Sequence, residues 1–159
     1  MDVNRRVFVT ALGVSLAIGA LAAATRGVVR LASAAGAAPP VSVWKSPSCG
    51  CCGAWVDHMR AAGHAVTVQD LDDVDPVKDR LGVPAALRSC HTALVDGYVL
   101  EGHVPADAVA RLLRERPAAR GLAVPGMPQG APGMETGVTE RYNVVLFGTP
   151  GGSLLFERR

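Results

Sequence analysis

The sequence predicts a small mixed α/β domain, because short strand-like segments alternate with helical ones along most of the chain. Residues 41–44 and 65–68 are runs of apolar and β-branched side chains of the kind found in strands. Between them, residues 53–62 carry apolar side chains at helical spacing, and Gly63 is a natural helix stop. These observations predict a strand, a helix and a second strand in that order.

Two further helices are predicted from their boundary residues. Residues 75–81 begin with an Asp-Pro pair that suits a helix start, and Gly82 closes the helix. A third helix begins at Pro105, presents an apolar face and ends at Pro117.

Two strand pairs are predicted in the second half of the chain. Residues 90–95 and 98–102 are strands joined by the turn signal Asp96-Gly97. Residues 142–147 and 153–156 flank a Pro-Gly-Gly turn and form a terminal hairpin.

Two segments are predicted to lack regular structure. Residues 34–40 are small and proline-containing, as in a linker, and residues 122–137 are rich in glycine and proline. The resulting order β-α-β-α-β-β-α is the layout of a thioredoxin-like domain, to which the C-terminal β-hairpin is an addition.

The first 37 residues have the pattern of an export signal. Arg5 and Arg6 precede an apolar stretch over residues 11–24, and small residues at 32–34 or 35–37 supply a cleavage site. The arginine pair is similar to a twin-arginine signal, with an ordinary secretory signal as the alternative. We therefore expect residues 38–159 to be the mature, periplasmic domain.

An uncleaved membrane anchor is the less favoured interpretation of the same segment. A span needs about 20 uninterrupted apolar residues, and Arg26 and Arg30 interrupt this one. No stable membrane span is therefore expected after processing.

The charge of the chain depends on this leader. It holds four of the 16 basic and one of the 14 acidic residues, so residues 38–159 have 12 basic and 13 acidic residues, a net charge of −1. With neither a basic stripe nor an aromatic stacking platform, nucleic acid is not an expected partner.

The cysteines are the main functional signal. Three lie within four residues, at Cys49, Cys51 and Cys52, where the first strand leads into the first helix. Exported proteins commonly use cysteines in structural disulfides. A bond between the adjacent Cys51 and Cys52 would be strained, however, and a Cys49–Cys52 bond would leave Cys51 over. Helix N-termini favour thiolate over thiol, which suits both redox exchange and metal binding.

Cys90 supplies the fourth thiol, at the start of the predicted third strand. In a thioredoxin-like sheet the segment leading into that strand faces the N-terminus of the first helix, so Cys90 is expected to converge on the triplet. Zinc accepts four cysteines but usually draws them from two separated pairs. Soft thiolates also select Cu(I). Four Cu(I) ions on four thiolates would be neutral, which eases burial.

Several motifs occur together and in order, and they identify a family resemblance. They are KSPSCGCCG at residues 45–53, RSCHT at 88–92, EGHVP at 101–105 and GLAVPGMP at 121–128. The chain resembles the domain-of-unknown-function family 411, which includes the CopG-type periplasmic copper-resistance proteins. The resemblance implies a thioredoxin-like fold, copper held by the four cysteines as one ion or a multinuclear cluster, and interconversion of Cu(I) and Cu(II) in copper resistance.

Other side chains with ligand chemistry have two interpretations each. His91 next to Cys90 is either an accessory metal ligand or a strand histidine bonded to the backbone, and His103 is either a ligand or a residue that positions the turn. Met127 is either a soft Cu(I) ligand in a lid or a gap-filling residue of the loop. His58 and His64 are expected at the surface, without a role.

Three functions follow from these observations. The first is a periplasmic copper-binding protein that holds Cu(I) on Cys49, Cys51, Cys52 and Cys90 and interconverts Cu(I) and Cu(II), with other envelope copper-handling proteins as partners. The second is a copper-sequestering module without turnover. The third is a thiol-disulfide oxidoreductase with Cys49 and Cys52 as the catalytic pair.

Overall fold

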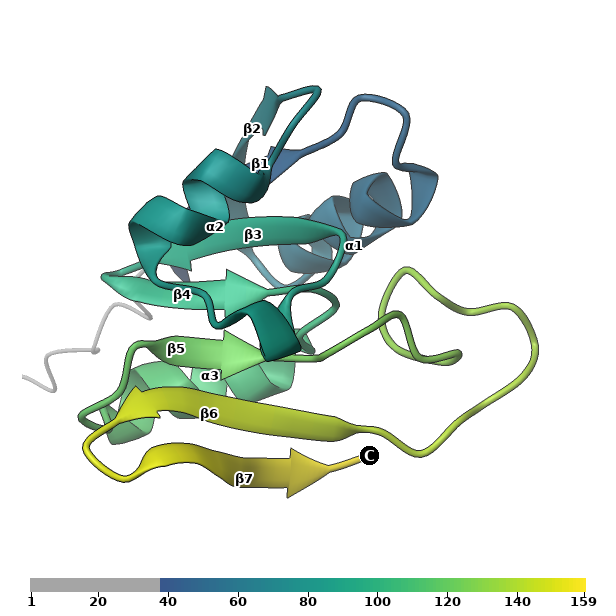
Figure 1. Ribbon diagram of the computed structural model, residues 1–159. Helices are drawn as coiled ribbons and strands as arrows, with labels where there is room; N and C mark the ends of the chain where they lie inside the picture. Colours follow the sequence, from purple (N-terminus) through teal and green to yellow (C-terminus); the bar gives the residue numbers. More distant parts are fainter. Residues whose placement is uncertain (1–37) are drawn as a thin grey trace, which may run out of the picture. The chain divides into compact units, whose positions relative to one another are not determined.

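A single mixed sheet runs through residues 38–159, the part of the chain that the computed structural model describes (Figure 1). The predicted export signal, residues 1–37, lies outside the described residues. The strands in sheet order are β2 (His64–Asp70), β1 (Ala38–Lys45), β3 (His91–Val95), β4 (Tyr98–Glu101), β5 (Gly121–Ala123), β6 (Asn143–Thr149) and β7 (Gly152–Arg158). The pairs β1/β2 and β4/β5 are parallel, and the other neighbouring pairs are antiparallel.

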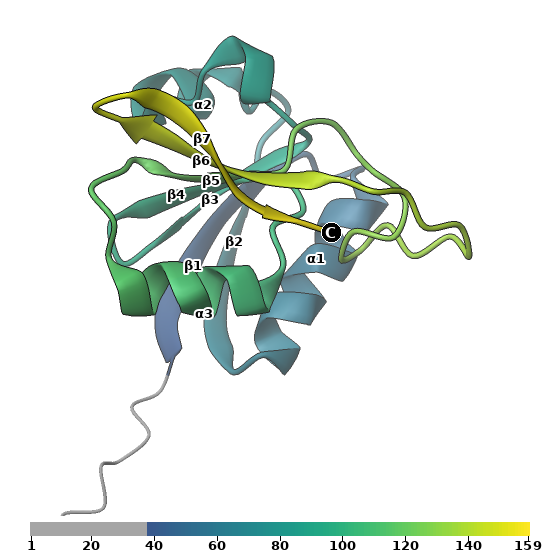
Figure 2. The same ribbon diagram turned by 90° about the horizontal axis from the view of Figure 1, so that it is seen from below.

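Three α-helices formed by residues 38–159 cover the sheet. Helices α1 (Gly50–Ala61) and α3 (Ala106–Glu115) lie on one face, and α2 (Asp75–Leu81) lies on the other (Figure 2). A single 3-10 turn, η1 (Ala85–Leu87), follows α2. Within residues 38–159, no helix is long and apolar enough to cross a membrane.

The two faces of the sheet bury separate apolar clusters. On the α1/α3 face, Trp55, Met59 and Leu112 pack against strand residues such as Leu100 and Leu122. On the α2 face a smaller cluster forms from Val83, Val99, Ala123 and Phe147. Neighbouring residues of β4 and β5 contribute to opposite clusters, as the alternation of side chains along a strand requires.

Local sequence signals predict several boundaries correctly. Helix α2 spans residues 75–81 as predicted, and Gly82 caps it in the left-handed region with φ 71°. The Asp96-Gly97 turn joins β3 to β4 with φ values of 46° and 86°, the two positive values that the hairpin turn requires.

Two predictions about irregular segments are wrong. Strand β1 begins at Ala38, inside the predicted linker, because Ala38 pairs with His64 of β2. Strand β5 lies inside the segment predicted as loop, and its pairing with β4 joins the first four strands to β6 and β7. The mixed α/β class itself is confirmed.

Gly121 allows the close approach of β5 to β4. A Cβ atom at this position would lie 1.8 Å from the Val99 carbonyl oxygen, a separation that side chains do not adopt. Since the obstacle is backbone of a central strand, a rotamer change cannot relieve it.

We therefore expect Gly121→Ala to lower the free energy of unfolding by about 3 kcal/mol or more, through overpacking of the sheet. Gly53→Ala is the matched control, because nothing lies within 4 Å of its added methyl group in α1. This control should gain about 0.5–1 kcal/mol from helix propensity. Urea unfolding of both variants measures the difference, and equal stability of the two would contradict the close approach.

Candidate metal centre

The four cysteines come from two segments that meet at one end of the sheet. Cys49 is the N-cap of α1, Cys51 and Cys52 lie in its first turn, and Cys90 immediately precedes β3. The four sulfur atoms all lie within 4.8 Å of one another. The predicted convergence of Cys90 on the triplet is therefore confirmed as geometry.

The start of α1 gives the sulfur atoms a positive electrostatic environment. The chain turns into the helix with a Cys49 N–H to Ser46 carbonyl bond of 3.1 Å, and the first turn contains no acidic residue. The unpaired N–H groups of the first turn and the helix dipole favour negative charge there. This end of the helix can therefore accept the negative charge of metal-bound thiolates.

Two of the four cysteines are joined. Cys49 and Cys52 form a disulfide, while Cys51 and Cys90 are free thiols. The Cys51 sulfur lies 3.5 Å from that of Cys49. The disulfide uses the C-x-x-C pair that the sequence identified, and it leaves Cys51 over as that spacing requires. All four sulfur atoms are available as metal ligands only when this bond is reduced.

His103 directs one ring nitrogen at Cys90. Its Nε2 lies 3.1 Å from the Cys90 sulfur, and its Nδ1 lies 2.7 Å from the Pro132 carbonyl oxygen. A carbonyl can only accept, so Nδ1 carries the proton and Nε2 presents its lone pair to Cys90. Burial lowers the pKa of His103, which keeps the ring neutral. Metal-binding histidines are commonly oriented by such a backbone acceptor.

His91 is fully buried beside the same sulfur. Its Nδ1 lies 3.3 Å from the Cys90 sulfur, and its ring packs on Trp55 at 4.5 Å and edge-on to His103 at 5.0 Å between centroids. Burial holds its pKa well below the usual value, with His103 and nearby lysines adding to the effect. Its Nε2 has no hydrogen-bond partner among the described residues. Ligand atoms of Cys90, His91 and His103 form a second group within 4.8 Å.

The protonation of Cys90 follows from this environment. Burial raises the pKa of the Cys90 thiol to about 11, and the neighbouring Cys51 adds to the increase. The protonated thiol donates to the free Nε2 of His103. Cys90 is therefore held as a neutral thiol until a metal or another reaction partner displaces its proton.

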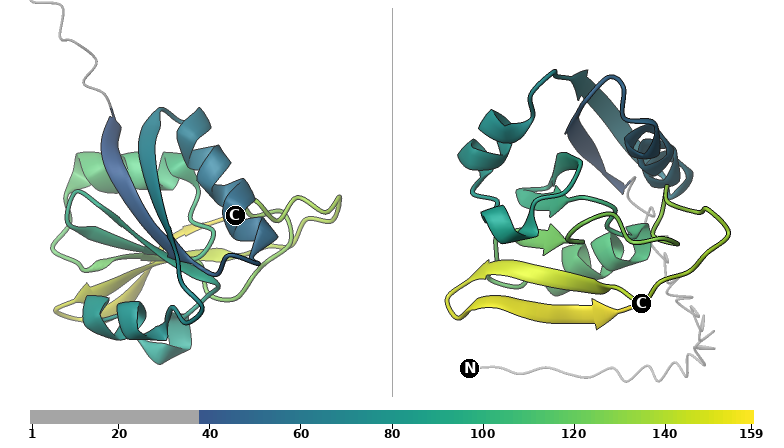
Figure 3. Two further views of the ribbon diagram at one scale, coloured as in Figure 1. Left: turned by 90° about the horizontal axis from the view of Figure 1, so that it is seen from above. Right: turned by 45° about the vertical axis from the view of Figure 1, so that its right-hand side comes forward.

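The loop between β5 and β6, residues 124–142, contains most of the predicted glycine- and proline-rich segment 122–137 and packs against the start of α1 (Figure 3). Gly133, with φ 86°, leaves no room for a side chain, since a Cβ atom would lie 2.7 Å from the Cys51 carbonyl oxygen. Pro132 in the same turn accepts the hydrogen bond from His103. Met127 is 53% exposed, so its role as a ligand remains a prediction.

Sequence analysis missed a polar network beneath Cys90. The ammonium group of Lys78 lies 2.6 Å from the Glu101 carboxylate, with side chains only 4% and 0% exposed. Thr92 donates to the other carboxylate oxygen, and the Ser89 amide donates to the first. Glu101 belongs to a recognised sequence motif, but no local pattern pairs it with a lysine 23 residues away.

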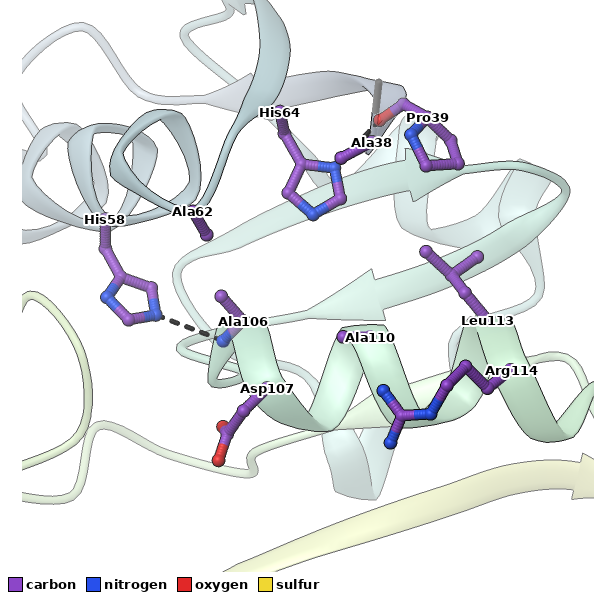
Figure 4. Close-up of a pocket in the computed structure, with 10 residues that line it drawn as sticks. All are labelled: Ala38, Pro39, His58, Ala62, His64, Ala106, Asp107, Ala110, Leu113 and Arg114. Atoms are coloured by element: carbon purple, nitrogen blue, oxygen red, sulfur yellow. Dashed lines mark hydrogen bonds between the residues drawn. The ribbon is translucent and has the colours of Figure 1, made fainter. Parts of the chain in front are cut away.

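A separate cavity of about 590 Å³ lies between α1, α3 and the start of β1 (Figure 4), and no cysteine lines it. His58 and His64 both line it. The prediction that His64 lies at the surface is wrong, because it is 7% exposed and its Nδ1 lies 2.8 Å from the Pro39 carbonyl oxygen. His58 is half-buried and accepts a hydrogen bond from the Ala106 amide.

Thiol alkylation tests the environment of Cys90. With its pKa near 11, roughly one Cys90 thiol in a thousand is ionised at pH 8. In the disulfide form we expect the Cys90 alkylation rate to rise about tenfold per pH unit from pH 8 to 10, because the thiolate is the nucleophile. Peptide mass mapping with iodoacetamide measures this rate, with Cys90→Ser as the assignment control. A plateau near pH 9 would contradict the buried, neutral thiol.

Comparisons with known proteins agree with this arrangement. The family model described as "Protein of unknown function, DUF411" matches residues 87–134, which include Cys90, His91 and His103. Two solved structures described as "Copper resistance protein copG", Form 1 and Form 2, each share 43% sequence identity with this chain. In both cases the match covers 77% of this chain and 98% of the other, with a TM-score of 0.72.

No curated protein sequence matches the chain. The 43% identity and 98% coverage of the solved structures, together with the family model, are sufficient to assign the family. The chain belongs to the DUF411 family of CopG-type proteins.

Proposed function

We propose that this protein binds Cu(I) through the thiolates of Cys49, Cys51, Cys52 and Cys90. The observation that carries this proposal is the convergence of all four sulfur atoms within 4.8 Å, from two segments almost forty residues apart. Such a concentration of sulfur is unnecessary for a single disulfide.

The donor set favours a soft ion over a hard one. Four thiolates, flanked by the neutral imidazoles of His91 and His103, match the preference of Cu(I) for sulfur and nitrogen ligands. The positive end of α1 offsets part of the thiolate charge, and several Cu(I) ions would offset the rest. The copper-resistance function named for the two similar structures supports copper over zinc.

The Cys49–Cys52 disulfide couples metal binding to electron transfer. When two thiolates join as a disulfide they release two electrons, which is the number needed to reduce two Cu(II) ions to Cu(I). Conversely, reduction of the disulfide by an external thiol restores two ligands. Cys49 and Cys52 are therefore proposed as the catalytic pair in Cu(I)/Cu(II) interconversion during copper resistance.

A thioredoxin-like architecture is part of this proposal. The strand order β2-β1-β3-β4, with β3 antiparallel to both neighbours and α2 on the face opposite α1 and α3, supports it. In this interpretation β5, β6 and β7 extend the sheet, with β6 and β7 as the added C-terminal hairpin. The leader pattern of residues 1–37 supports export to the periplasm, where other envelope copper-handling proteins would exchange the metal.

Thiol-disulfide exchange with protein substrates is a second candidate function. The specific observation that favours it is the Cys49–Cys52 bond at a helix N-terminus, with Cys49 half-buried and Cys52 fully buried. A more accessible attacking cysteine and a buried resolving cysteine suit such exchange. Copper sequestration without turnover is the third alternative.

Anaerobic Cu(I) titration tests the metal site. The fragment of residues 38–159 should bind Cu(I) once its disulfide is reduced. Cys51→Ser or Cys90→Ser should weaken Cu(I) binding by about tenfold or more, because each variant removes a thiolate ligand. Competition with bathocuproine disulfonate gives the affinities. Ser48→Ala is the matched control, since Ser48 is exposed next to Cys49 and bonds only with Ser46.

The copper site would be refuted if both cysteine variants bound Cu(I) as tightly as the wild type. It would also be refuted if the disulfide form bound as many Cu(I) ions as the reduced form, because Cys49 and Cys52 would then not be ligands.

Turnover is a separate prediction. Catalytic amounts of the protein should accelerate the reduction of Cu(II) by excess glutathione, and Cys52→Ser should abolish the acceleration because the disulfide cannot form. Formation of the coloured Cu(I)–bathocuproine complex measures the rate. Copper binding without any acceleration would identify a sequestering module, and insulin reduction without copper binding would identify a thiol-disulfide oxidoreductase.

A further inference from the structure

The buried network of Lys78, Thr92 and Glu101 lies on the face of the sheet opposite α1. Thr92 and Glu101 are cross-strand partners in β3 and β4, and Lys78 reaches them from α2. The Lys78 ammonium donates to Glu101 Oε1 at 2.6 Å and to the Thr92 hydroxyl at 3.0 Å, and that hydroxyl donates to Glu101 Oε2 at 2.6 Å. Both carboxylate oxygens are thus fixed in direction.

One contact of this network reaches the residue that precedes Cys90. The backbone N–H of Ser89 donates to Glu101 Oε1 at 2.6 Å. Ser89 precedes Cys90 in the short segment between η1 and β3, before strand pairing begins at His91. The Ser89 amide therefore donates to a side-chain carboxylate, whereas the amide of a residue within a strand would donate to a backbone carbonyl.

A need for stability does not account for this network. Burying an ion pair costs solvation free energy, and apolar replacements of similar volume are often neutral or stabilising. An apolar trio would fill the same space but would offer the Ser89 amide no acceptor. What the charged network supplies specifically is a carboxylate oxygen at a fixed position beneath the Ser89–Cys90 segment.

We propose that Glu101 is a positioning residue that holds Cys90 beside the cysteine triplet. In this proposal Lys78 and Thr92 orient the Glu101 carboxylate. This inference rests on the proposed copper site, because it concerns the placement of one of its four ligands. Gly102 contributes to the same placement, since a Cβ atom there would lie 2.6 Å from the Ser89 side chain. Glu101 need not touch the metal to act in this way.

Two double variants separate positioning from charge. Lys78→Met with Glu101→Gln removes both charges but keeps an amide oxygen for Ser89 and an amide group for the Thr92 hydroxyl. Lys78→Met with Glu101→Leu removes the same charges and also the acceptor. The two double variants differ mainly in whether the Ser89 amide has a hydrogen-bond acceptor.

Two measurements are made on each variant. For the Leu variant we expect Cu(I) affinity, by bathocuproine disulfonate competition, to fall about tenfold or more, and the Ser89 amide to exchange faster with deuterium. The Gln variant should stay within about threefold of the wild type in both measurements. Equal affinities and equal Ser89 exchange in the two variants would overturn the proposal.

Thr92→Val keeps the experiment decisive if the Leu variant does not fold. It preserves the β-branched shape but removes the hydroxyl that orients Glu101, so Ser89 exchange should accelerate and Cu(I) affinity should fall by several-fold. Unchanged values would overturn the proposal. If the wild type binds no Cu(I), the proposed function fails, whereas Ser89 exchange in the same variants still reports on positioning.

Discussion

The indole of Trp55 contacts the segments that surround the thiol cluster. Its Nε1–H donates to the Val104 carbonyl at 2.8 Å, which ties α1 to the turn that carries His103. Its ring packs on His91, and its backbone lies against Gly133 of the long loop. Because the side chain is completely buried and hydrogen-bonded, it fixes the start of α1 relative to β3. That relation places the triplet at the start of α1 beside Cys90.

The thiol cluster is supported differently from the two faces of the sheet. On the α1 face the support is aromatic and apolar, with the neutral rings of His91 and His103 against Trp55. On the α2 face it is ionic, through Lys78 and Glu101. Apolar packing buries the Cys52 side chain, while the ionic network provides direction, since hydrogen bonds to a buried carboxylate fix geometry more narrowly than apolar contacts do. The Ser89–Cys90 segment lies where the two kinds of support meet.

Sequence patterns predicted the parts of the fold that local interactions determine. Helix α2, the Asp96-Gly97 turn and the cysteine triplet at the start of α1 depend on residues close in the chain, and all three were predicted correctly. Strand β5 was missed because it is three residues long and exists through pairing with β4 and β6, with Gly121 against Val99. The Lys78–Glu101 pair was missed for a related reason, since charged residues are expected at the surface unless a distant partner compensates them.

In the proposed function, the disulfide and the copper site would use the same two sulfur atoms, and this competition would link copper affinity to reduction. Any preference of Cu(I) for the dithiol state over the disulfide state must make the disulfide easier to reduce by the same free energy. Each tenfold preference raises the reduction potential of the Cys49–Cys52 pair by about 30 mV. Cys51 and Cys90, which the disulfide leaves free, would be available as sulfur ligands in both states. A copper site built in this way would change its ligand number with its redox state, so electron supply would determine how firmly copper is held.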